Sequence, residues 1–549
     1  MQPLDSCQSG QSAGVMADEV DHRGEELPAL SKRSGNVNLE RILKLHKPDF
    51  SEKSVMTPGF WPLIRVMLHY GRRHVLKSTS YHYHSDDPND GPGVLAVAWH
   101  TAGLIDPLPI VLTIDKPFVF AGRQDVLTGP IIGWWGRRMG VQPLLRQAER
   151  QRGHVDDDTA KRVNSSSMLT VASKLAHGHA SVLMPEGHSH TEWHIIRFRT
   201  GPIRSALNAS ALARELGNEP PVILPVGLTY RDPHAWFTDL AVEFSEPLKL
   251  PELADTDHGK HLMAGEWIEP DRETTLAVRN ELRDSLGSLA PDAPDFETWR
   301  AWLLLGQLNS TSNGSPCTTW QEEVFAARFI RDRLRGSSGR VWQGPEACGR
   351  EDLASTSNLT TRAREAASTL HEMNLDGRAT QQVPRTQFIA KISLVTVLFP
   401  LILALAPFAL LGNGLQWLVG WGLARYNGEA IDKRTTFHMM PTVLGAVFFR
   451  PVVHLTSAAA LLHYDTTIAS IFSDILPTSL AIYPVYLFLA FLIIWVSTDI
   501  CTVFCRELFF YHLIDIRREW RTLRAHRSAA WKPLQTQLDD LTSSLDALK

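Results

Sequence analysis

A long run without any charged side chain constrains this chain more than any other feature. Residues Ile392 to Ala424 contain no Asp, Glu, Lys or Arg. The first part of the run, about 392–411, would extend roughly 30 Å as a helix, which matches the hydrocarbon thickness of a bilayer. A second uncharged run covers about 475–498. Because buried core helices are seldom uninterrupted over such lengths, we expect both segments to span a membrane.

The residues around these two runs carry further signals. The Gly-Asn-Gly sequence at 412–414 predicts a turn after the first span. Residues 435–464 are apolar but are interrupted by the Arg-Pro pair at 450–451, so their structure stays open at this stage. Arginines are frequent after the second span, and Arg385 and Lys391 precede the first. An even number of spans would therefore place both basic flanks on the cytoplasmic side.

Length and composition limit the class of protein. The chain has 549 residues, of which 44% are apolar and 21% charged, so it is too long for one domain and too polar for a continuous membrane bundle. A net charge of −4 argues against a dedicated nucleic-acid binder, and five cysteines are too few for a disulfide framework. The acidic N-terminal residues contain no apolar segment typical of a secretory signal.

These patterns predict five regions along the chain. We expect a disordered tail at 1–50 and an α/β domain at 51–300. A helical insert or linker follows at 301–385, then a transmembrane region with two spans at 386–505, and a basic helical C-terminal segment at 506–549.

Residues 51–300 alternate short apolar runs with helical patterns. The runs end at Gly, Pro or polar residues and suit strands that are buried on both faces; they cover 94–100, 118–122, 179–187, 221–230 and 240–250. The alternation predicts an α/β domain with a mostly parallel or mixed sheet flanked by helices, followed by a helical membrane-anchoring C-terminal region. In such domains, catalytic residues gather at the carboxyl ends of the strands.

Polar residues follow the first of these predicted strands. His100 ends the run, and Asp106 comes after five intervening residues and is followed by Pro107. Asp before Pro is typical of a helix start, so Asp106 could simply cap a helix. A carboxylate held there could also hydrogen-bond to one imidazole nitrogen and leave the other as a general base. Both interpretations remain open from these residues alone.

Three more blocks follow in order. They are a Gly-x5-Arg block at 140–146, a Pro-Glu-Gly-His-Ser-His block at 185–190, and an apolar strand with a proline at 222–227. With the His–Asp block before them, they make residues 60–250 resemble the membrane-associated phospholipid/glycerol acyltransferase family. The spacing between His100 and Asp106 resembles the branch of fungal-type glycerol-3-phosphate and dihydroxyacetone-phosphate acyltransferases and their bacterial relatives. The usual Ser or Asn inside the first block is missing here.

The resemblance implies a role for each residue. His100 would be the general base for the acceptor hydroxyl and Asp106 would orient it, without an acyl-enzyme. Arg146 would bind phosphate, which a guanidinium can contact with two hydrogen bonds. Pro225 would shape the acyl tunnel, and Arg199 stands where Lys is commoner in the family. The implied substrate-binding residues are Arg146, Glu186, Gly187, Ser189, His190, Arg199 and Pro225.

The resemblance also implies the substrates and the location. The donor would be acyl-CoA or acyl-carrier protein as co-substrate, without a further cofactor, and the acceptor would be glycerol 3-phosphate. Lysophosphatidate and dihydroxyacetone phosphate are alternative acceptors, because each also carries a phosphate and a free hydroxyl. We expect an integral membrane protein whose catalytic domain lies on the cytoplasmic side.

Two other classes of protein are alternatives. A metal-dependent hydrolase could use the histidines and aspartates of 82–87 together with His188, His190 and His194. However, residues 82–91 predict a surface loop, and the spacing of the other residues is not typical of a metal site, so we expect no metal. A non-catalytic membrane scaffold would be expected to lack His100 or Asp106, and both are present.

Overall fold

The structure is a computed structural model of the whole chain. It describes Ile42 and residues 48–546, apart from 86–88, 90, 125–126, 128–131, 146–154, 337–340, 343–351, 427–433, 465–466, 468–469, 472–473 and 475–482. Most of the predicted tail at 1–50, Arg146 and the start of the second predicted span therefore lie outside the described residues.

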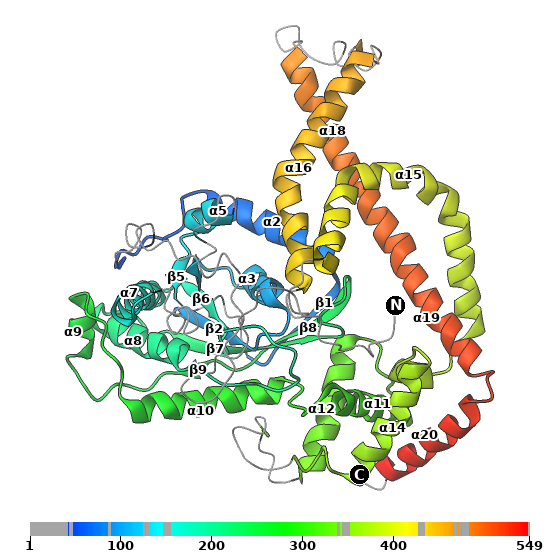
Figure 1. Ribbon diagram of the computed structural model, residues 1–549, viewed down its shortest axis with the longest axis horizontal. Helices are drawn as coiled ribbons and strands as arrows, with labels where there is room; N and C mark the ends of the chain where they lie inside the picture. Colours follow the sequence, from blue (N-terminus) through cyan, green and yellow to red (C-terminus); the bar gives the residue numbers. More distant parts are fainter. Residues whose placement is uncertain are drawn as a thin grey trace.

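A seven-stranded mixed sheet forms the centre of the N-terminal half (Figure 1). The strand order is β1-β8-β7-β2-β6-β3, with β9 paired to β7. Strand β2 is parallel to β6 and β7, whereas β7 and β8 are antiparallel. The strands are β1 (Leu76–Tyr83), β2 (Val94–Ala98), β3 (Phe118–Val119), β6 (Ala180–Leu183), β7 (Val222–Tyr230), β8 (Thr238–Phe244) and β9 (Leu248–Lys249).

Helices cover this sheet, as the apolar runs predict. All five residues of β2 and all four of β6 are buried, because each strand is covered on both faces. In Figure 1, α2 lies above the sheet and α10 lies below it. The predicted α/β fold is confirmed. The helices of this domain are α2 (Phe60–Val75), α3 (Pro107–Thr113), α5 (Ile132–Arg138), α7 (Asp157–Ala176), α8 (Gly201–Glu215), α9 (His258–Met263) and α10 (Arg272–Leu289).

The prediction of a surface loop from residue 82 onward is wrong at its start. His82 and Tyr83 are the last residues of β1, an edge strand that pairs with β8 in parallel. Its sequence, LKSTSYHY, is polar at most positions because one edge of the strand has no neighbour in the sheet, so no apolar run marked it. A separate two-stranded sheet joins β4 (Ala121–Arg123) to β5 (Gln142–Leu144).

A helical unit follows the sheet domain, and its helices pack around one apolar core. This core includes the buried Trp299 and Trp302 together with residues of the C-terminal helix, among them Trp531 and Leu541. Figure 1 shows this C-terminal helix beside the helices of the insert. The helices are α11 (Phe296–Ser312), α12 (Trp320–Arg335), α14 (Asn358–Glu372) and α20 (Trp531–Asp546). The chain thus returns to this unit after the membrane segments.

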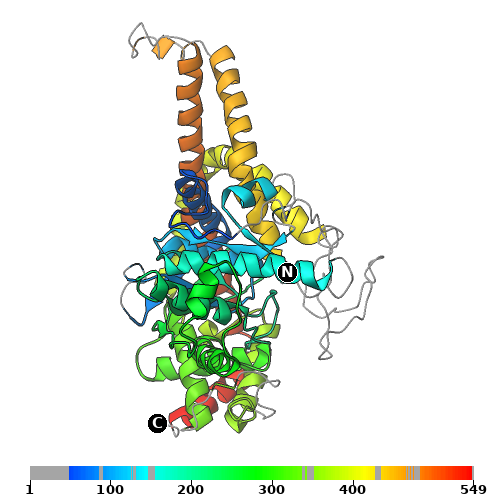
Figure 2. The same cartoon turned by 90° about the vertical axis from the view of Figure 1, so that its left-hand side faces the viewer.

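Three described helices, rather than two, are long and apolar enough to cross a membrane. They are α15 (Arg385–Tyr426), α16 (Arg434–Tyr464) and the long helix that begins with α18 (Tyr483–Phe504) and continues through a π-helical turn into α19 (Tyr511–Ala525). The predicted turn at 412–414 is wrong, because α15 continues through it. Figures 1 and 2 both show α16 and α18 projecting together from the body of the protein.

Both ends of this membrane region lie together. The ring of Phe388, near the start of α15, stacks on Trp520 of α19 with 6.3 Å between ring centroids. His526, directly after α19, contacts the carbonyl of Ala379 through Nε2 at 2.8 Å. The apolar helices therefore leave from the helical unit and return to it.

Candidate active site

His100 and Asp106 meet at the carboxyl end of β2. The chain leaves the strand at Trp99, whose indole Nε1 donates to the carbonyl of Leu228 in β7 at 2.7 Å and fixes this strand end. Nδ1 of His100 lies 2.7 Å from Oδ2 of Asp106. The carboxylate is fully buried, whereas the side chain of His100 keeps 20% of its surface accessible. An ionised Asp106 therefore selects the tautomer with the proton on Nδ1.

Asp106 stands at the N-cap position of α3 but does not cap it with its side chain. Oδ2 instead accepts a second hydrogen bond from the backbone N–H of Ala102, at 2.9 Å. The carboxylate is thus turned back into the loop between the two residues. Among the described residues, none hydrogen-bonds to Nε2 of His100, so this nitrogen is available as a proton acceptor.

Glu186 joins this loop to the Pro-Glu-Gly segment. Its Oε2 accepts from the backbone N–H of His100 at 2.7 Å, and its Oε1 accepts from that of Ile196 at 3.0 Å. The residue is 1% exposed. Because both oxygens are occupied inside the protein, its contacts favour a positioning role over direct contact with a substrate.

His190 lies against the same carboxylate. Its Nε2 is 2.9 Å from Oε1 of Glu186, and its backbone N–H donates to the carbonyl of His100 at 3.0 Å. Burial alone would lower the pKa of His190, but the negative charge of Glu186 raises it above the usual value. Ser189 is half-buried in the same turn. Glu186, Ser189 and His190 are thus brought to the side of His100.

Gly187 and Arg199 are in contact at the next turn. Gly187 has φ of 80°, which is favourable only for glycine, and a Cβ there would lie 2.8 Å from Nε of Arg199. Backbone N–H of Arg199 donates to the carbonyl of Pro185 at 2.9 Å. The Nε–H of Arg199 also donates to the carbonyl of Glu186 at 3.4 Å, so the guanidinium is held over the Pro-Glu-Gly turn.

Pro225 lies inside β7, where a proline would normally disrupt the ladder. It is next to Val97 of the parallel β2, and its carbonyl accepts from the N–H of Ser245. The antiparallel partner of β7 changes here from β8, which ends at Phe244, to β9, which begins at Leu248. The missing N–H therefore falls where no regular ladder bond is needed. A role in an acyl tunnel stays a prediction.

Tyr230, at the end of β7, was not among the predicted site residues. Burial, together with the nearby carboxylate of Asp106, raises its pKa well above the usual value for tyrosine. The residue is 3% exposed. Its only sequence signal was its position at the carboxyl end of a predicted strand, which His100 and Glu186 share.

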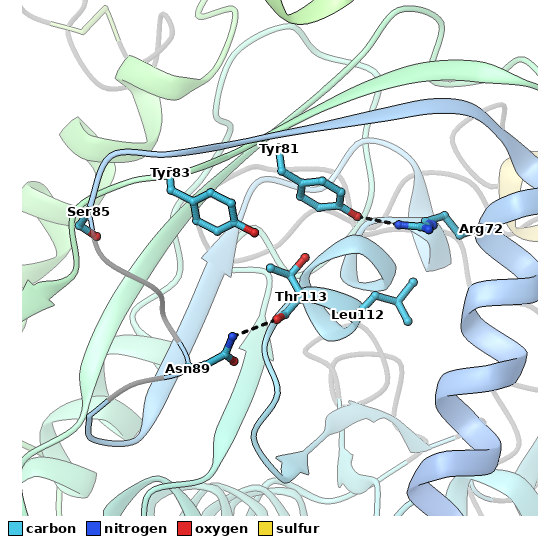
Figure 3. A pocket seen from close by; sticks show the side chains of 7 residues that line it. All are labelled: Arg72, Tyr81, Tyr83, Ser85, Asn89, Leu112 and Thr113. Carbon is cyan, nitrogen blue, oxygen red and sulfur yellow. Dashed lines mark hydrogen bonds between the residues drawn. The ribbon is translucent and has the colours of Figure 1, made fainter.

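A pocket is formed away from these residues, between α2, β1 and the end of α3. It measures about 600 Å³ and is lined by Arg72, Tyr81, Tyr83, Ser85, Asn89, Leu112 and Thr113. Figure 3 shows both tyrosines projecting from β1 toward the end of α3, with Arg72 donating to Tyr81. None of the predicted site residues lines it. Arg146, the predicted phosphate ligand, lies outside the described residues, so its position relative to His100 stays a prediction.

The histidines of the metal alternative do not gather. His84 contacts Glu243 of β8 at 2.6 Å, whereas His190 contacts Glu186 near the strand end of β6. Within the described part of the chain, no three His, Cys, Asp or Glu side chains are grouped closely enough to hold a metal ion. Asp86 and Asp87 lie outside that part.

Comparison with known proteins identifies one domain. Residues 79–229 match the model of the acyltransferase family. The chain is 29% identical over 128 residues to an uncharacterised acyltransferase of Schizosaccharomyces pombe, covering 23% of this chain and 17% of that protein. It is 26% identical over 141 residues to glycerol-3-phosphate O-acyltransferase 1 of Saccharomyces cerevisiae, covering 25% of this chain and 17% of that protein. The matches thus cover under a fifth of each relative.

Proposed function

Because residues 79–229 match the acyltransferase family model, we propose that the chain is a membrane enzyme of the phospholipid/glycerol acyltransferase family that acylates a phosphorylated glycerol. It moves a fatty acyl group from acyl-CoA, or from acyl-carrier protein, to the hydroxyl of glycerol 3-phosphate. One observation carries this proposal: the buried carboxylate of Asp106 holds Nδ1 of His100 at 2.7 Å and leaves Nε2 available.

The chemistry of this pair suits direct acyl transfer. Nε2 of His100 accepts the proton of the acceptor hydroxyl while its oxygen attacks the thioester carbonyl, and the thiolate leaves and takes up a proton. Asp106 stabilises the imidazolium that forms and fixes the ring orientation. No nucleophilic side chain of the protein is needed, because the substrate supplies the nucleophile.

The name of one relative favours glycerol 3-phosphate as the acceptor, and nearby positive charge favours any acceptor that carries a phosphate. The yeast relative with 26% identity is a glycerol-3-phosphate O-acyltransferase by name. The guanidinium of Arg199 adjoins the Pro-Glu-Gly turn, and Arg146 follows β5, so positive charge for a phosphate is available on two segments of the domain. Lysophosphatidate and dihydroxyacetone phosphate are the alternative acceptors.

The second part of the proposal is that the enzyme acts at a membrane. Three long apolar helices indicate membrane association, and a lipid product is best released where a bilayer is adjacent. We place the catalytic domain on the cytoplasmic side, where acyl-CoA is made. This orientation agrees with the basic residues that flank the apolar segments at Arg385 and after Arg506.

An assay with separate acceptors tests which one the protein uses. Membranes containing the protein would receive labelled acyl-CoA with glycerol 3-phosphate, dihydroxyacetone phosphate or lysophosphatidate, each offered separately. We expect the highest kcat/KM with glycerol 3-phosphate. Equal or greater turnover with lysophosphatidate would assign the acceptor differently, and no transfer to any of the three would overturn the proposed function.

A further inference from the structure

We propose that membrane helix α16 supports the active-site loop through Thr436, which is a positioning residue for the turn between His100 and Asp106. The inference rests on the proposed function and extends it, because it gives a membrane helix a role beyond anchoring. It starts from one contact: Oγ1 of Thr436, in the first turns of α16, accepts from the backbone N–H of Leu104 at 3.2 Å.

Leu104 is the middle residue of the turn that sets the distance between the two catalytic side chains. The turn is a short 3₁₀ helix, Gly103–Ile105, that closes on Asp106. Three neighbouring backbone donors are used within the loop: Ala102 donates to the Asp106 carboxylate, Ile105 to the carbonyl of Ala102, and Asp106 to the carbonyl of Gly103. The N–H of Leu104 is directed outward instead, to α16.

The first half of α16 is built into the catalytic domain. Met439 belongs to the main apolar core of that domain and is 4% exposed. The ring of His438 stacks on Trp236 at 4.6 Å between centroids. Gly71 of α2 approaches α16 so closely that a Cβ there would lie 2.7 Å from Cγ2 of Val443. The helix is therefore held on several sides where it meets the loop, so Thr436 has a fixed position.

The second half of α16 is fixed to the other apolar helices. The buried Arg450 pairs with Asp499 at 2.8 Å, and Nε2 of His454 lies 2.7 Å from Oγ1 of Thr498 in α18. Beyond these contacts α16 projects from the body with α18 (Figures 1 and 2). One helix thus connects the apolar hairpin directly to the turn between His100 and Asp106.

Loss of this contact should alter turnover more than substrate binding. The turn places Asp106, and Asp106 orients His100, so a shift of the turn misaligns the base without removing any group that contacts a substrate. We expect kcat of Thr436→Val to fall by about fivefold to tenfold, with KM changed by less than about twofold. Thr436→Ser keeps the acceptor oxygen and should restore most of the activity.

Thr442→Val is the matched control. Thr442 lies in the same helix, is fully buried, and its hydroxyl donates to the carbonyl of His438 in its own helix at 2.9 Å. The same change of side chain is made there without touching the catalytic turn. The full-length proteins would be compared in membranes for kcat, KM and amount, and in detergent for Tm.

The outcomes are distinguishable. A fall in kcat for Thr436→Val alone, with rescue by Thr436→Ser and wild-type Tm, supports the inference. Wild-type kinetics of Thr436→Val, or an equal fall in the Thr442→Val control, would overturn it while the wild-type enzyme still acylates its acceptor. If the wild-type protein transfers no acyl group, the proposed function fails first.

Discussion

Glu186 has a positioning role, because its carboxylate joins the backbone at His100 to the backbone at Ile196. Its two oxygens accept from the N–H groups of His100 and Ile196, and Oε1 also contacts His190. In Glu186→Gln, the amide NH₂ must face one of these donors, so one buried N–H loses its acceptor. We expect kcat to fall roughly tenfold to hundredfold, because the loop that carries His100 shifts.

The control for Glu186→Gln is Glu192→Gln, which makes the same change on an exposed side chain of the same segment. Acyl transfer by both variants would be measured at equal protein levels in membranes. Unchanged kcat in Glu186→Gln would contradict the positioning role.

Gly187 offers a second residue-scale prediction. Ala at this position must adopt φ near 80° and would contact Arg199. Gly178 has φ of 84°, and a Cβ there would meet no atom within 4 Å, so Gly178→Ala carries the backbone strain alone. Each variant should lose about 1–2 kcal/mol of stability from that strain. We expect only Gly187→Ala to raise the KM for the acceptor, and equal KM values would argue against a substrate-binding role for Arg199.

At the scale of elements, α2 is the junction between the sheet domain and the apolar helices. Tyr70 contacts Asn413 of α15, and the carbonyl of His74 accepts from Nε1 of Trp236 at 2.7 Å. Burial lowers the pKa of His74 to about 3. The imidazole is therefore neutral in the folded protein, whereas it titrates near its usual value when unfolded.

This difference predicts a pH dependence of stability. Between pH 6.5 and the folded pKa of about 3, the unfolded state binds more protons, so stability falls as pH falls. At pH 5.5 the loss is about 1 kcal/mol. We expect His74→Phe to show a smaller drop in Tm from pH 7.5 to 5.5 than the wild-type protein does. Equal drops would mean that His74 is not the group responsible.

The elements that could be predicted are those that form uninterrupted apolar runs in the sequence because they are buried. β2, β6 and β7 are covered on both faces and appear as apolar runs. The apparent turn at 412–414 could not be resolved locally, because Gly412 is needed for contact with Thr498 and Asn413 donates to Thr502. Helix α16 could not be predicted either, because Arg450 interrupts its apolar sequence and the partner of this charge, Asp499, belongs to another helix.

In the candidate site, too, contacts between residues far apart in the sequence could not be predicted. The order of its four blocks could be predicted, and the His100–Asp106 contact agrees with it. The contact between Leu104 and Thr436 joins residues more than 300 positions apart, and no local pattern marks such a pair. The oxygens of Glu186 were also beyond prediction, because their donors are backbone N–H groups.

At the scale of the whole molecule, the course of the chain limits its membrane topology. Helix α20 and the helices before α15 share one core, and α15 and α19 meet at Phe388 and Trp520. We therefore expect both ends of the apolar region to lie on the same side of a membrane, which requires an even number of crossings. Of the three long apolar helices, two would cross as the α16–α18 hairpin, and α15 would not cross completely.

Cysteine labelling tests this topology. In a variant without native cysteines, Lys53→Cys and Ser528→Cys place a thiol on the sheet domain and directly after α19, both at exposed positions. An impermeant thiol reagent should label both from the same side of sealed vesicles. Labelling of the two from opposite sides would contradict an even number of crossings.

The most direct test of the whole account is acyl transfer by His100→Ala. Membranes with equal amounts of wild-type protein, His100→Ala and the control His177→Ala, which lies at the end of α7, would receive labelled acyl-CoA and glycerol 3-phosphate. We expect turnover to fall at least about a hundredfold in His100→Ala alone, with wild-type Tm. Wild-type turnover by His100→Ala would contradict the assignment of the imidazole as the base.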